Sequence, residues 1–153
     1  MIPDPSTVTF ILAIGAGNYF VYDSFQIDVT SSNFARRYMW NMDTDPMWTT
    51  ENQWAWGVPQ GNSGDPSSGY TGSQVYGYNL AGNYANNLPE TNLTTGAIDC
   101  TGLADVELRF MRWVGVESAT YDHAYVRQSN DGVRWTQILN PYGRRFTDPA
   151  WQP

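Results

Sequence analysis

The side chains that most often carry catalysis are few in this sequence. It holds one histidine, His123, beside Asp122, and one cysteine, Cys100. A zinc site needs three or four protein ligands, usually several His or Cys, and a hydrolase nucleophile elbow needs Gly-x-Ser-x-Gly, which does not occur. Nothing in the spacing of the four glutamates selects a glycosidase pair. We therefore predict that the chain is not an enzyme.

Aromatic residues offer a different chemistry, because flat rings stack on the apolar faces of sugars while nearby polar groups bind the hydroxyls. Seven Trp and ten Tyr exceed what a core of this size requires, so we expect some at the surface. Four tryptophans lie in strand-like motifs and are expected to pack inside. The predicted ligand-binding residues are the tyrosines near the loops, namely Tyr70, Tyr76, Tyr78 and Tyr84.

The elements that must position these residues are strands. Apolar residues alternate with polar ones in several runs, as in Val106, Leu108 and Phe110, and this spacing of two is typical of half-buried strands. The segment Ser129-Asn130-Asp131-Gly132 indicates a tight hairpin turn. We predict an all-β fold, a two-sheet antiparallel sandwich of the jelly-roll type, with residues 57–73 as a long loop that is functional or tied down.

The charge of the chain limits its partners. Its net charge is -7, and its eight basic residues are all arginines scattered along the sequence. Nucleic-acid binders need a dense basic face, so nucleic acid is excluded as a partner. The apolar run from Thr7 to Ile14 is too short to span a bilayer and lacks the preceding basic residues of a signal peptide. We expect one domain over residues 1–153, without membrane insertion, its export signal removed or encoded upstream.

Five short motifs share their order and spacing with one known family: WAWGVP (54–59), VYGYNLAGNY (75–84), LTTGAIDC (93–100), LRFMRW (108–113) and YDHA (121–124). Together they resemble the MAM-like jelly-roll domains of large secreted bacterial proteins, related to the accessory domain of immune-inhibitor-A-type metallopeptidases. The resemblance covers residues 34–151. It implies an extracellular or cell-surface module.

Domains of this family close with two further strands after a segment like residues 146–151. Here the matching pattern stands at the other end of the chain, as the apolar run 7–14, a glycine turn, and Phe25-Gln26-Ile27-Asp28-Val29. We rank three interpretations in order. Residues 1–30 complete the sandwich of their own chain as a circular permutation, they complete a neighbour's sheet by strand exchange, or the match is chance.

The resemblance also implies calcium near the junction of the first and last strands. Asp28, Asp43 and Asp45 are the predicted ligands, since they would meet there if residues 1–30 close the sandwich, and Ca²⁺ favours carboxylate oxygens. The alternative is that these aspartates are solvated turn carboxylates. Asp65, in the long loop, is a less specific candidate.

Our leading hypothesis is a non-catalytic extracellular adhesion or carbohydrate-binding module, stabilised by calcium. Its partner would be a glycan or a cell-surface protein. The main alternative is a structural subunit of a filament or surface layer that polymerises with copies of itself through its N-terminal strands. A third hypothesis is an accessory domain of a secreted protease or glycosidase.

Overall fold

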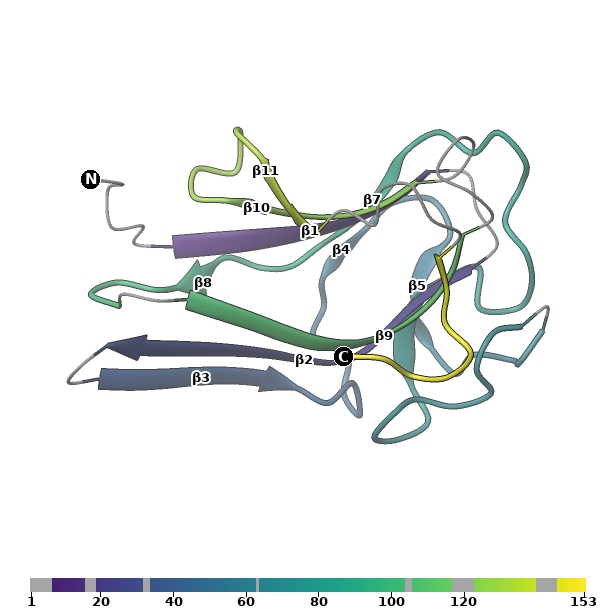
Figure 1. The fold of residues 1–153 in the computed structure, drawn as a ribbon, viewed down its shortest axis with the longest axis horizontal. Helices are drawn as coiled ribbons and strands as arrows, with labels where there is room; N and C mark the ends of the chain where they lie inside the picture. The colour runs from purple at the N-terminus through teal and green to yellow at the C-terminus, as the bar shows by residue number, and fades with distance from the viewer. Residues whose placement is uncertain are drawn as a thin grey trace.

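The computed structural model describes residues 7–15, 19–31, 34–62, 64–103, 106–116, 123–139 and 146–153. Within these ranges the chain forms strands, turns and loops, with no helix, and therefore no helix that could cross a membrane. The strands make two antiparallel sheets that lie against each other as two layers (Figure 1). The predicted all-β sandwich is confirmed.

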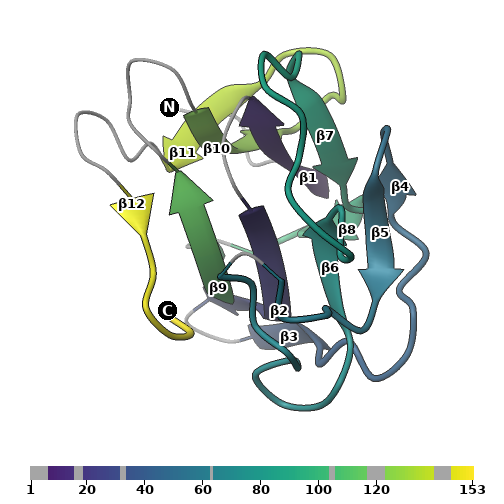
Figure 2. The ribbon, with the colours of Figure 1, turned by 90° about the vertical axis from the view of Figure 1, so that its right-hand side faces the viewer.

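Each sheet has six strands. The first contains β1 (Thr7–Gly15), β4 (Thr49–Thr50), β7 (Thr91–Thr94), β8 (Ile98–Asp99), β10 (His123–Ser129) and β11 (Thr136–Leu139). The second contains β2 (Tyr19–Ser31), β3 (Phe34–Trp40), β5 (Trp54–Gly57), β6 (Val75–Tyr78), β9 (Val106–Val116) and β12 (Phe146–Thr147). The chain passes between the two sheets repeatedly, as it does in a jelly roll (Figure 2).

The two N-terminal strands occupy central positions. The first sheet has the order β11-β10-β1-β7-β4, with β8 also beside β1, and the second has the order β12-β9-β2-β6-β5, with β3 also beside β2. β1 therefore lies between β10 and β7, and β2 between β9 and β6. In this structure the N-terminal strands therefore lie inside both sheets of their own chain.

The core between the sheets is rich in aromatic side chains. Phe10 from the first sheet and Tyr76 from the second are both almost completely buried. The Trp48 and Tyr76 rings stack with centroids 5.3 Å apart, and the Trp48 amide donates to the Tyr76 hydroxyl at 3.1 Å. The same cluster contains Leu93 and Val114, so side chains from both layers meet in one core.

The hairpin between β10 and β11 follows its predicted turn but is longer than expected. The sequence predicts a strand from Val133, whereas β11 begins at Thr136 and Val133 is exposed. The Asp131 carboxylate explains this correction, because its Oδ1 accepts the amides of Val133 at 2.8 Å and Arg134 at 2.7 Å. Those bonds hold Val133 and Arg134 in the turn, while Gly132 supplies the positive φ of 70°.

Candidate functional site

The single histidine lies in a stacked row on the outward face of β10. The His123 and Tyr125 rings stack with centroids 5.8 Å apart, and the Arg127 guanidinium lies 4.7 Å from the Tyr125 ring centroid. Arg127 donates to both oxygens of Glu90, at 2.6 and 3.0 Å, and these bonds lower the pKa of Glu90. Ring stacking and the ion pair with Glu90 therefore fix the positions of His123, Tyr125 and Arg127. Asp122 lies outside the described residues.

Three of the four predicted ligand-binding tyrosines are buried. Tyr76, Tyr78 and Tyr84 are 2%, 3% and 9% exposed, so the expectation that they form a surface was wrong. The reason is that β6, which contains Tyr76 and Tyr78, is buried along its whole length between β2 and β5. The Tyr84 ring packs edge-on against Tyr78 with centroids 6.3 Å apart. Sequence proximity to loops does not reveal this burial.

Tyr70 is the predicted tyrosine that does lie at the surface, with 55% of its area exposed. Its ring meets Trp151 edge-on at 6.5 Å, and Trp151 meets Trp113 at 5.8 Å. The Trp113 indole also donates to the carbonyl of Gly64 at 3.0 Å. Trp151 is missing from the sequence-based list, although Asp148-Pro149-Ala150-Trp151 repeats the pattern of Asp45-Pro46-Met47-Trp48 and marks it as a comparable position.

The three predicted calcium ligands lie on different parts of the fold. Asp28 pairs in register with Arg37, the middle residue of β3, and with Glu107, whereas Asp43 and Asp45 follow β3 in the chain. The Asp43 carboxylate accepts from Asn41, and that of Asp45 accepts the Met47 amide at 2.8 Å. Both are local contacts of turn carboxylates. The Asp45 carboxylate also accepts from the Tyr76 hydroxyl of β6 at 2.5 Å.

Side chains that could bind a metal do not gather in the described part of the chain. It contains no group of three His, Cys, Asp or Glu side chains placed to hold an ion. Asp28 lies opposite the middle of β3, and Asp43 and Asp45 follow the end of that strand at Trp40. The Asp28 side chain is not among those described, and calcium binding stays a prediction.

The long loop of residues 57–73 is tied down, which is one of its two expected roles. The Gln60 amide donates to the Leu80 carbonyl at 3.0 Å, and the Asn62 side chain donates to the Ala81 carbonyl at 2.9 Å. Inside this loop, Asp65 is only 8% exposed, and its Oδ1 has no hydrogen-bond partner among the described residues. Burial raises the pKa of Asp65 to about 7.

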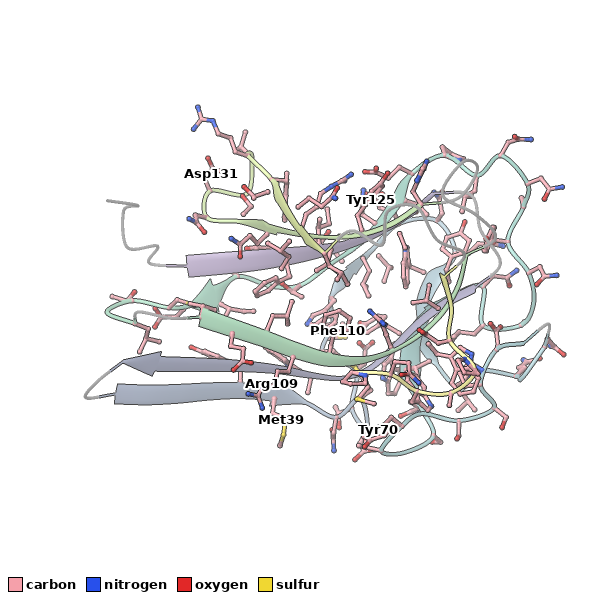
Figure 3. All side chains as sticks on the ribbon, viewed as in Figure 1. Met39, Tyr70, Arg109, Phe110, Tyr125 and Asp131 are labelled. Atoms are coloured by element: carbon pink, nitrogen blue, oxygen red, sulfur yellow. The ribbon has the colours of Figure 1, made fainter. Side chains whose placement is uncertain are left out.

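A groove of about 500 Å³ lies along the edge of β9. Leu108 and Phe110 of β9 line it together with Val126 and Leu139 of the first sheet. Figure 3 shows Phe110 between the two layers, with Met39 and Tyr70 on the far side of the second sheet. Met39 and Tyr70 also line the groove, and both are exposed. The groove depends on how two sheets meet, which no local sequence pattern encodes.

The chain is similar to part of a known peptidase. A stretch of 102 residues, 65% of this chain, is 37% identical to a region of Bacillopeptidase F from Bacillus subtilis (strain 168). That region makes up 7% of Bacillopeptidase F, so the similarity concerns a small part of the larger protein. No family model matches the chain. No solved structure matches it either.

Proposed function

We propose that this chain is a non-catalytic accessory module of an extracellular peptidase, of the MAM-like type. The observation that carries the proposal is its similarity to a region that forms 7% of Bacillopeptidase F. A region that small in a large enzyme is the size of an added module. The packing of His123 against Tyr125 gives that histidine a structural role, which agrees with a non-catalytic module.

An exchange of modules tests this proposal. Replacing the matched region of Bacillopeptidase F by this chain should preserve export and proteolysis of an unfolded protein substrate, because an accessory sandwich folds and acts independently of the catalytic domain. Deleting the region without replacement serves as the control and should lower either property. A chimera that behaves no better than the deletion would exclude the accessory role.

Carbohydrate recognition remains a second candidate, favoured by the exposed Tyr70 ring beside Trp151. We expect the purified chain to bind members of a glycan array and Tyr70→Ala to lose that binding, because the ring would no longer stack on the sugar. Val133→Ala is the control, since Val133 is 79% exposed and lies in the hairpin between β10 and β11 of the first sheet. Running the array in calcium and in chelator tests the calcium prediction. Signal without calcium would remove the ion from the proposal, and no signal at all would remove the glycan.

Polymerisation by strand exchange is the remaining alternative. β1 and β2 pair within their own chain in this structure, so no observation favours their transfer to a neighbour. We therefore place this alternative below the accessory module.

A further inference from the structure

The tip of the long loop lies against the outer face of the second sheet. Val114 of β9 is completely buried in the core, so the side chain of its neighbour Trp113 points away from the core. The Trp113 indole donates to the Gly64 carbonyl at 3.0 Å, which places the loop on that outer face. Trp113 also meets the Trp151 ring edge-on. The loop therefore occupies the indole N–H group of an aromatic cluster on this face.

This loop tip, residues 61, 62 and 64–66, is folded as a unit of its own. The Gly61 amide donates to the Pro66 carbonyl at 3.1 Å, and the Asp65 amide donates to the Asn62 carbonyl at 3.0 Å. The Asn62 side chain joins the tip to Ala81 at 2.9 Å. None of the five residues belongs to a strand. The tip can therefore leave the sheet without breaking any strand pairing.

Closure of the loop tip buries the Asp65 carboxyl group. Asp65 is 8% exposed, and its Oδ1 is buried without a hydrogen-bond partner among the described residues. A charged carboxylate is costly in such surroundings, whereas a protonated one is tolerated. Moving the tip off the sheet returns the carboxyl group to water. The closed tip therefore favours the protonated form of Asp65, and the open tip favours the charged form.

Charges near the loop do not compensate a carboxylate at Asp65. The titratable side chains described on the loop and on the segments that contact it are Asp43, Tyr70, Glu107, Arg109, Arg112 and Asp148. Arg109 is bonded to Glu107 at 3.0 Å, and Arg112 lies 3.5 Å from Asp148. Burial alone raises the pKa of Asp65 to about 7, so none of these described groups acts on it. Asp23 of β2 is in register with Met111, and its side chain is not among those described.

We propose that the loop tip is a pH-dependent lid on the outer face of the second sheet, closed on Trp113 while Asp65 is protonated and opened when Asp65 ionises. Opening frees the Trp113 indole N–H and adds the Trp113 ring to the surface formed by Trp151 and Tyr70. Opening should become easier as the pH rises from about 4 to about 7, and should change little above that range. This inference concerns the loop and holds whether or not the chain is an accessory module of a peptidase.

The first test measures opening directly, by hydrogen exchange of the Gly61 and Asp65 amides and the Trp113 indole in NMR spectra. After correction for the intrinsic effect of pH, exchange should become faster on the order of 100-fold from pH 5 to pH 8, because the closed lid keeps a proton that the open lid releases. Urea below the unfolding transition should not change these rates, since lid opening exposes little surface. Rates that rise with urea in parallel with that of the Val114 amide would assign the exchange to global unfolding and overturn the lid.

The second test uses variants. Asp65→Asn should remove the pH dependence of exchange, because asparagine does not ionise, whereas the control Asp23→Asn should retain it. The opposite pattern would overturn the proposal. Trp113→Phe should speed exchange of the Gly61 and Asp65 amides about two- to tenfold at every pH, since the lid loses its bond to the indole. Unchanged exchange in Trp113→Phe would show that the lid does not close on this residue.

A third measurement separates protonation of Asp65 from cation binding. Exchange of the Gly61 and Asp65 amides is recorded for the wild type in chelator and in millimolar calcium. We expect the same pH dependence in both conditions. A pH dependence that calcium abolishes would make Asp65 a metal ligand and would overturn the lid.

Discussion

Replacing Asp65 by asparagine should stabilise the protein at about pH 8, by roughly 2–4 kcal/mol, and should leave its stability below about pH 4 nearly unchanged. The pKa of Asp65 is raised from 3.8 to about 7 by burial. Between these values the folded chain keeps a proton that the unfolded chain releases. Stability therefore falls as the pH rises through this window and stays low above it. The reason is that charging a buried carboxylate is costly when its Oδ1 has no hydrogen-bond partner among the described residues.

The measurement is urea unfolding of the wild type and Asp65→Asn at several pH values, with the difference between the two curves as the result. Asp131→Asn provides a control of opposite sign. Hydrogen bonds from the backbone amides of Arg134 and Val133 lower the pKa of Asp131. The charged carboxylate therefore stabilises the fold at neutral pH, and this stabilisation is lost on acidification. Asp131→Asn should therefore destabilise the protein at neutral pH only. A difference curve for Asp65→Asn that is flat from acid to base would show that the pKa of Asp65 is not raised in the folded chain.

Replacing Phe10 by alanine should destabilise the protein by about 3–5 kcal/mol, the usual range for removing a buried phenylalanine side chain. Phe10 is 1% exposed, and its amide donates to the Thr95 hydroxyl at 3.0 Å in the middle of the first sheet. A loss of this size approaches the whole stability of many domains, so partial unfolding at room temperature is expected in the circular dichroism spectrum.

Two further variants make this result interpretable. Phe10→Leu should cost less, about 1–1.5 kcal/mol, and remain folded enough for a full urea titration. Val133→Ala should change stability by less than about 0.5 kcal/mol, because Val133 is 79% exposed in the hairpin. If Phe10→Ala were as stable as Val133→Ala, β1 would not be a core strand.

Local patterns in the sequence were sufficient for the fold class. The alternation of Val106, Leu108 and Phe110 predicts β9, and Ser129 to Gly132 predicts the β10–β11 hairpin, because both signals depend on neighbouring residues. The end of that hairpin was less predictable. The Asp131 carboxylate binds two amides beyond the turn, and this delays β11 to Thr136.

The candidate sites depend on distant parts of the chain, and the sequence predicted them poorly. Tyr76 and Tyr78 are buried because β2 and β5 flank β6, and neither strand is signalled by the residues around the tyrosines. Whether the buried Oδ1 of Asp65 finds a hydrogen-bond partner depends on the residues that fold around the loop, and none of the described residues provides one. The groove forms where β9 of one sheet meets β10 and β11 of the other. The periodicity of a sequence predicts single strands, and it does not predict which strands pack against one another.

The central position of β1 has a consequence for biosynthesis. Thr9 pairs with Ser129, so residues 120 positions apart must meet. During translation β1 leaves the ribosome long before β10 exists, and it carries an apolar run with unsatisfied backbone groups in the meantime. Contacts of such sequence separation slow folding. The nascent chain is therefore most exposed to aggregation between the synthesis of β2 and that of β10, and holdase chaperones that cover extended apolar segments should associate with it in that interval.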